Sequence, residues 1–162
     1  MTKNIQFRNY LKTGDLGKII QAQALLYKEE YGYPMPFEGY LCTVMAEFYA
    51  HFDDKKDGVW ICESEGQMVG FIALMHRPND AAQLRLFYLD KAFRGKGLGQ
   101  QMMTFWLQHC RDKQFKFAYL WTSADQIEAV ALYKKFGFQL VEEKETMTFG
   151  KVAIEQKFEL KF

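Results

Sequence analysis

Three glycines stand within five residues of one short segment, Arg94-Gly95-Lys96-Gly97-Leu98-Gly99-Gln100. It follows residues 81–90, which read as a strand, and precedes residues 97–113, where apolar side chains recur at helical spacing. Glycine lacks a Cβ, so the backbone here can approach a ligand closely. The start of the following helix offers amide protons and a partial positive charge, which suit a diphosphate. The pattern predicts an anion-binding turn, while a flexible glycine turn without a ligand is the structural alternative.

Two familiar glycine motifs do not fit this segment. The dinucleotide pattern G-x-G-x-x-G fails, because Gln100 and Met102 occupy the third glycine position in its two registers. The P-loop pattern fails as well, because the chain contains no Gly-Lys-Ser or Gly-Lys-Thr. What remains is Arg-x-x-Gly-x-Gly, with the charges of Arg94 and Lys96 beside the turn.

Length and charge bound the rest of the chain. Its 162 residues predict a single domain, and 49% hydrophobic residues are enough for a packed core. A net charge of +1 gives no global field that would attract nucleic acid or an anionic membrane, so we expect neither as a partner. Three widely separated cysteines argue against a disulfide framework. With no apolar leader after Met1, we expect a cytoplasmic protein.

Periodicity predicts an α/β (α+β) domain in the order β-α-α-β-β-β-α-β-α-β-β. Glu65-Gly66 predicts a two-residue hairpin turn, and Ser123 with Gln126 predicts a capping box for the last helix. The strands are expected at residues 4–11, 59–64, 68–76, 81–90 and 115–122, with two more at the end of the chain, the last at 152–162. The helices are expected at about residues 14–31, 37–52, 97–113 and 123–135.

A second motif follows the glycine turn by about 30 residues: Gln126-x-x-Ala129-x-x-Leu132-Tyr133-x-x-Phe136-Gly137-Phe138. Together with Arg94-x-x-Gly97-x-Gly99, it resembles the GNAT superfamily of N-acetyltransferases. The resemblance implies a mixed central sheet of about seven strands with about four helices on its two faces. A narrower likeness, carried by segments such as Glu30-Tyr31-Gly32 and Phe149-Gly150, is to the acetyltransferase half of MarR-type helix-turn-helix/GNAT fusion proteins.

The resemblance implies acetyl-coenzyme A as co-substrate and no metal. The residues that it places at the coenzyme are Phe87, Leu89, Arg94, Gly95, Lys96, Gly97, Leu98, Gly99, Gln100, Gln126 and Tyr133. Of these, the backbone amide near Leu89 would polarise the thioester carbonyl, and Tyr133 would donate a proton to the leaving thiolate. Packing on an amphipathic helix is the structural alternative for Tyr133. Gln126 departs from the usual asparagine, so its capping role competes with a coenzyme contact.

The expected general base is missing from its usual strand position, where Gln83 stands. An amide does not take a proton at neutral pH, so the base must be another group, such as Glu30, or a water relay. Glu30, Tyr31, Arg85 and Trp121 are the candidates for the acceptor side. Strand alternation places Arg85 on the face of Gln83, Phe87 and Leu89, where its charge needs an internal carboxylate or an acidic acceptor. His51, His76 and His109 show no metal-ligand spacing.

The function predicted from these residues is direct acetyl transfer from acetyl-coenzyme A to an amine. The acceptor is a small-molecule or peptide amine, and a homodimer is considered as the oligomeric state. Two alternatives stay open. One is a catalytically silent acyl-coenzyme A-binding module, which the missing glutamate favours and Tyr133 disfavours. The other is an interaction domain that partners a DNA-binding regulator.

Overall fold

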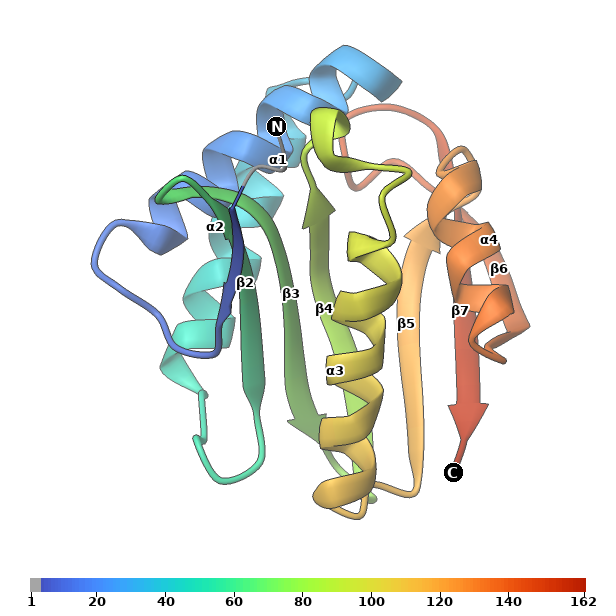
Figure 1. Cartoon of the computed structure of the whole chain (residues 1–162). Coiled ribbons are helices and arrows are strands. Elements are labelled where there is room, and N and C mark those ends of the chain that lie inside the picture. Colours follow the sequence, from blue (N-terminus) through green and yellow to red (C-terminus); the bar gives the residue numbers. More distant parts are fainter. Residues whose placement is uncertain (1–3) are drawn as a thin grey trace. The chain divides into compact units, whose positions relative to one another are not determined.

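The helices and strands follow one another in the order that the periodicity predicts. A computed structural model describes residues 4–162, and Figure 1 shows its elements. The strands are β1 (Ile5–Arg8), β2 (Gly58–Ser64), β3 (Gln67–Arg77), β4 (Ala81–Leu89), β5 (Phe117–Ser123), β6 (Gln139–Thr146) and β7 (Ala153–Lys161). The helices are α1 (Asp15–Tyr31), α2 (Met35–Ala50), α3 (Leu98–Asp112) and α4 (Ile127–Lys135), with a 3-10 turn, η1, at Lys91–Phe93. The strands form a mixed sheet in the order β1-β2-β3-β4-β5-β7-β6.

The chain divides into two compact units. The first unit contains the described residues up to Leu11, Asp53–Leu120 and Leu160–Phe162. The second unit contains Lys12–Phe52 and Trp121–Glu159. No helix among residues 4–162 is long and apolar enough to cross a membrane.

In the first unit, α3 packs on one face of the sheet (Figure 1). The Phe105 ring meets Phe7 of β1 at 5.1 Å between centroids, and the His109 ring meets Trp60 of β2 at 5.3 Å. Trp106 is fully buried, and its indole Nε1 donates a hydrogen bond to the Ala73 carbonyl over 3.0 Å. The apolar stripe of α3 therefore forms a core with the β1–β3 strands, as its helical spacing predicts.

The hairpin between β2 and β3 confirms the turn predicted at Glu65-Gly66. Both residues have positive φ, 53° and 75°, which is the backbone conformation of a two-residue hairpin loop. Glutamate adopts this conformation at some cost, and glycine adopts it freely. The turn sets the antiparallel register of β2 on β3, beginning with Ser64 opposite Gln67.

A bulge in β4 corrects the predicted alternation of that strand. Arg85 lies opposite Ala73 and Phe87 lies opposite the neighbouring residue Ile72, so Leu86 is the extra residue and has φ 59°. An extra residue reverses the facing of everything that follows it. Arg85 therefore shares a face with Gln83, as predicted, but Phe87 and Leu89 lie on the opposite face, which is the face covered by α3.

The second unit is built around an aromatic cluster. Tyr33 and Phe37, which flank the start of α2, pack against Tyr27 of α1 and against Phe149 of the β6–β7 loop, at centroid distances between 4.8 and 5.8 Å. Tyr33 is 2% exposed, and burial raises the pKa of its phenol. These rings join helix α1, the α1–α2 connection and the β6–β7 loop into one core.

The capping box predicted at Ser123 and Gln126 is wrong. Helix α4 begins at Ile127 with Gln126 as its N-cap residue, and no side chain caps it. Both predicted capping side chains instead bond to distant tyrosines. Ser123 Oγ accepts a hydrogen bond from the Tyr33 hydroxyl over 3.0 Å, and Gln126 Oε1 accepts one from the Tyr27 hydroxyl over 3.3 Å.

Candidate active site

The glycine turn of the first unit leads directly into α3. Gly95 and Gly97 have φ of 72° and 79°, and Gly97 is the N-cap residue of a helix that begins at Leu98. A Cβ added to either glycine would meet no atom within 4 Å. The glycines are therefore not required by packing, and the open space beside them lies at the amide end of a 15-residue helix. Such an end favours a bound anion.

Two basic side chains are held beside this turn. Arg94 Nε donates to the Leu89 carbonyl over 3.1 Å, which ties the turn to the end of β4. Lys96 Nζ donates to the Ala92 carbonyl over 2.9 Å and lies 5.4 Å from the centre of the Phe93 ring. These contacts fix both cations at the mouth of the turn, where they add to the field of the helix.

The end of β4 turns two backbone amides away from β3. The Asp90 amide donates to the Val69 carbonyl over 2.8 Å, so the N–H of Asp90 points toward β3. Backbone groups alternate along an extended strand, so the N–H groups of Leu89 and Phe87 point to the other edge of β4. The pairing of β4 with β5 runs from Ala81 opposite Phe117 to Gln83 opposite Tyr119. Leu89 thus carries an N–H donor at the end of the strand that leads into the glycine turn.

Gln83 is held as a hydrogen-bond acceptor. Gln83 is only 5% exposed. Its Oε1 accepts a hydrogen bond from Arg77 Nε over 2.7 Å and another from the Tyr119 hydroxyl over 3.4 Å. Neither bond requires a carboxylate. Arg85 is half-buried and follows Gln83 on the same face of β4.

Tyr133 of α4 is buried in the second unit. It is 4% exposed, and its ring lies 6.1 Å from Phe138 and 6.4 Å from Phe158. Burial raises the pKa of Tyr133 well above that of a phenol in water. At neutral pH the side chain is therefore a neutral O–H donor, as proton donation requires.

Gln126 takes part in a polar network rather than a helix cap. Its Oε1 accepts from the Tyr27 hydroxyl and also from Thr122 Oγ1 over 3.1 Å. Two donors on one oxygen fix the orientation of the amide. Sequence reasoning missed Tyr27 and Tyr33, because no local pattern links α1 to the end of β5.

The acceptor-side candidates of the second unit have distinct surroundings. The Tyr31 ring lies 5.2 Å from that of Tyr27, and the Tyr31 carbonyl accepts from Lys151 Nζ. Lys144 Nζ lies 4.5 Å from the centre of the Trp121 ring and pairs with Glu155 over 3.8 Å. Glu30 is half-buried near the end of α1. Tyr31 and Trp121 thus each contact a lysine that lies near a carboxylate. Lys144 lies near Glu155, and Lys151 lies 3.7 Å from Asp125.

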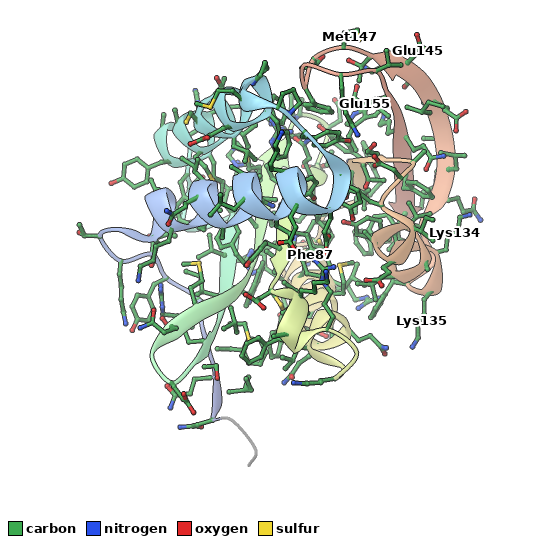
Figure 2. The ribbon with its side chains drawn as sticks, turned by 90° about the horizontal axis from the view of Figure 1, so that it is seen from above. Phe87, Lys134, Lys135, Glu145, Met147 and Glu155 are labelled. Atoms are coloured by element: carbon green, nitrogen blue, oxygen red, sulfur yellow. The ribbon has the colours of Figure 1, made fainter. Side chains whose placement is uncertain are left out.

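Several side chains of the second unit lie on its outside. Lys134 and Lys135 project outward from the end of α4, Glu145 lies near the end of β6, and Met147 lies in the loop that follows β6 (Figure 2). All of β6 except its last residue is exposed. None of these side chains was predicted to act in the site.

The histidines bond to single neighbours. His51 and His109 contact the backbone carbonyls of Glu47 and Lys56, and His76 Nδ1 lies 2.8 Å from Asp57 Oδ1. Among residues 4–162, no group of three His, Cys, Asp or Glu side chains is arranged to hold a metal ion.

Residues 22–138 match the model of a family described as "Acetyltransferase (GNAT) family". The chain belongs to the GNAT acetyltransferase family. An uncharacterized N-acetyltransferase of Escherichia coli, YjgM, is 32% identical over 99 residues, which cover 59% of this chain and 59% of that protein. The chain spans about half the length of the curated relatives it matches.

Solved GNAT structures confirm the predicted fold. An acetyltransferase from Staphylococcus aureus superposes with a TM-score of 0.80 at 17% identity, covering 98% of this chain and 99% of that one. YncA from Salmonella typhimurium, a putative acetyltransferase solved with acetyl-CoA, gives 0.73 at 16% identity, covering 98% and 94%. The mixed seven-stranded sheet with four helices, described over residues 4–162, is thus the GNAT fold.

Proposed function

We propose that this GNAT protein is an N-acetyltransferase that transfers the acetyl group of acetyl-CoA directly to an amine. The observation that carries the proposal is the open glycine turn at the start of α3, next to a strand end that offers the Leu89 N–H. Packing places no atom where a side chain at Gly95 or Gly97 would lie, so the backbone of the turn has room for a ligand beside it. The residues present fit the coenzyme, because the turn supplies amide donors and two cations for its diphosphate.

In the proposed complex, the backbone of residues 95–100, Gly97 included, binds the diphosphate together with Arg94. Bound acetyl-CoA supplies the thioester whose acyl carbon is attacked. The edge of β4 at Phe87 and Leu89 that faces away from β3 binds the pantetheine arm, and the Leu89 amide donates to the thioester oxygen. One such donor contributes about 2.7–4 kcal/mol to lowering the barrier.

Tyr133 is proposed to donate its proton to the leaving sulfur. A phenol is un-ionised at neutral pH and therefore carries the proton that the thiolate takes. Gln83 is already an acceptor for Arg77 and Tyr119 and does not act as base. We propose Glu30 for that task, with Gln126 contacting the coenzyme through its amide and with Tyr31, Arg85 and Trp121 contacting the acceptor.

The chemical class of the acceptor is open, and several further predictions accompany this proposal. They are a single domain, a cytoplasmic location, a homodimer, and no nucleic acid or membrane partner. The narrower likeness to MarR-type fusion proteins also stays a prediction, because the matches described above support the GNAT family only.

The test is a panel of amines incubated with acetyl-CoA and assayed for free thiol. The panel contains spermidine, tyramine, L-alanine, a peptide with a free N-terminus and Nα-acetyl-L-lysine amide. We expect at least one to be acetylated, and expect Tyr133→Phe to lower turnover about 10²–10⁴-fold while acetyl-CoA affinity changes little. Tyr49→Phe, at a residue 64% exposed, is the control. Binding of acetyl-CoA without acetylation of any panel amine favours the catalytically silent module instead.

A further inference from the structure

Helix α2 differs from an ordinary surface helix in the composition of its exposed side. Its buried residues are Phe37, Leu41, Val44, Met45 and Phe48. The opposite side, called the α2 face below, is exposed and consists of Met35, Gly39, Cys42, Thr43, Ala46, Tyr49 and Ala50. Between Met35 and Ala50, all of which the structure describes, the only charged residues are Glu38 and Glu47, which are half-buried at the two edges of this face. A helix without a charged side is normally covered all round.

Helix α3 shows what the exposed side of a surface helix usually contains. Its exposed residues are all polar or charged, and they are Gln100, Gln101, Thr104, Gln108, Arg111 and Asp112. On the α2 face, by contrast, Met35 is 70% exposed and Tyr49 is 64% exposed. The hydroxyl near the centre of this face, Thr43 Oγ1, already donates to the Gly39 carbonyl over 3.3 Å. The α2 face therefore resembles a buried surface more than one that is in contact with water.

Five residues of the α2 face form one line along the helix. Met35, Gly39, Cys42, Ala46 and Tyr49 follow one another at intervals of four, three, four and three residues. This average spacing of 3.5 residues is that of the seam by which one helix packs along another. The two ends of the line carry large side chains, and the residues between them are small. The line is therefore complementary in shape to a copy of itself that runs in the opposite direction.

We propose that the α2 face packs against the α2 face of a second copy of the chain, with the two helices antiparallel about a two-fold axis near Cys42. The inference names a surface for the homodimer predicted above and does not depend on the acetylation reaction. In this arrangement Met35 of each copy lies beside Tyr49 of the other, and Gly39 lies beside Ala46. The small residues let the helices approach closely, and a thioether against an aromatic ring is a favourable contact.

A second copy fits this face better than other partners do. The core of a protein interface is depleted of charged residues and enriched in Met and Tyr, as the α2 face is. Burial against a charged surface would leave the charges of that surface without partners, and a second copy brings none to the centre of the contact. A two-fold contact also covers the same patch on both copies, so neither copy keeps it exposed. A lipid surface is disfavoured, because helices that bind membranes carry Lys and Arg beside the apolar face, where α2 has Glu38 and Glu47.

The size of the α2 face predicts a weak dimer. The helix is about 24 Å long and about 10 Å wide, so its face is smaller than the roughly 800 Å² per partner of a standard interface. Interfaces at this lower limit belong to transient complexes. We therefore expect a Kd of about 10–100 µM, with a monomer in dilute solution and a dimer in concentrated solution.

The first test is sedimentation equilibrium of the full chain without substrates, at concentrations from about 1 to 500 µM. We expect the mass to rise from the 19.1 kDa of one chain toward twice that value. Ala46→Glu places a carboxylate in the middle of the face and should raise the Kd at least about 100-fold. Gln21→Glu adds the same charge at an exposed position of α1 and is the control, whose Kd should not change. Glutamate is a good helix former, so both variants should keep the unfolding temperature of the unmodified monomer.

Cross-linking through Cys42 measures the geometry independently. Cys42 is exposed beside the two-fold axis, whereas Cys62 and Cys110 are buried. A short bismaleimide should therefore join the Cys42 thiols of two copies and give a covalent dimer on a denaturing gel. Ala46→Glu leaves the thiol exposed, so loss of the product in that variant reports loss of the contact. Cys42→Ser shows whether any product arises from other side chains.

Two results would overturn the assignment. Unmodified protein that stays monomeric up to about 500 µM means that the α2 face has another occupant, which is lipid if phosphatidylcholine vesicles bind the protein and bind Ala46→Glu less. A dimer that persists in Ala46→Glu and does not cross-link through Cys42 uses another surface. A chain that dimerises through α2 but acetylates no amine supports the interface and contradicts only the proposed function.

Discussion

Two glycine turns, one in each unit, share a backbone conformation and differ in their surroundings. Gly97 has φ 79° and Gly150 has φ 81°. A Cβ added to Gly97 would meet no atom within 4 Å, whereas one added to Gly150 would lie 2.7 Å from Pro34 Cγ and 2.9 Å from Pro36 Cγ. Positive φ alone explains why both residues are glycine, so it does not show which of the turns binds a ligand.

The surroundings separate the two cases. The turn at Gly150 is filled by Pro34, which precedes α2, and by Pro36 of the first turn of α2. Lys151, next to it, bonds to the Tyr31 carbonyl. Its glycine is needed by the packing of the second unit. The turn at Gly97 has open space and cations beside it. Gly150 is therefore a structural glycine, and we propose that Gly97 lets the backbone approach the coenzyme.

The largest expected effect is that of Gly97→Val on coenzyme binding. The branched side chain would fill the space that the diphosphate needs, so we expect binding of acetyl-CoA to fall below detection in calorimetry. The left-handed backbone should cost about 1–2 kcal/mol of unfolding free energy. Gly66→Val is the matched control, because Gly66 has φ 75° and open space in the β2–β3 turn. Unchanged affinity in Gly97→Val would sink the assignment of this turn.

Gly150→Ala should give the opposite pattern. The methyl group must displace two proline rings, and the backbone is left-handed, so we expect the unfolding free energy to fall by about 2–4 kcal/mol. Acetyl-CoA affinity should stay within a few-fold. Urea unfolding measures the first quantity and calorimetry the second. Gly32→Ala, with φ 71° and no atom within 4 Å, should lose less stability. Equal losses in the two variants would contradict the packing explanation.

How much the sequence can predict depends on whether a feature is set by neighbouring residues or by distant ones. The Glu65-Gly66 hairpin and the stripe of α3 follow from neighbouring residues, and both are confirmed. The glycine turn and its helix were also predictable, because the three glycines are local to it. The bulge at Leu86 was not, since nothing in Gln-Leu-Arg-Leu-Phe distinguishes a leucine with positive φ from an ordinary strand residue.

Long-range side-chain bonds account for the rest of what was missed. Ser123 and Gln126 have the residue types and the spacing of a capping box, and that spacing is local. Their oxygens instead accept from Tyr33 and Tyr27, which lie 90 and 99 residues away in the chain. A distant phenol competes for the same acceptor, and only the folded structure decides between them.

A smaller effect is expected from Lys151, which adds polar contacts to the packed turn. Its Nζ bonds to the Tyr31 carbonyl, lies 3.7 Å from Asp125 and stands 4.4 Å from the Tyr33 ring centre. The side chain is 32% exposed, which weakens its electrostatic contribution. We expect Lys151→Met to lower the unfolding free energy by about 0.5–1.5 kcal/mol. Lys134→Met on the outside of α4 should have no measurable effect in the same urea titration.

The last prediction concerns alkaline pH and the buried phenol of Tyr133. Burial raises its pKa in the folded protein above the value of about 10 found in unfolded chains. Above pH 10 the unfolded chain loses this proton first, so it binds fewer protons than the folded state. The stability due to the buried phenol is therefore fully present below pH 10 and is lost as pH rises, by up to about 1.4 kcal/mol per pH unit. Phenylalanine cannot ionise, so Tyr133→Phe should lose less unfolding free energy between pH 9.5 and about 11 than the unmodified protein does.

The measurement is urea unfolding at a series of pH values, with Tyr49→Phe as control. If Tyr133→Phe and Tyr49→Phe show the same pH dependence, the Tyr133 phenol reaches water in the folded protein. The space around the phenol would then be open, as it is at Gly97, and not packed, as it is at Gly150.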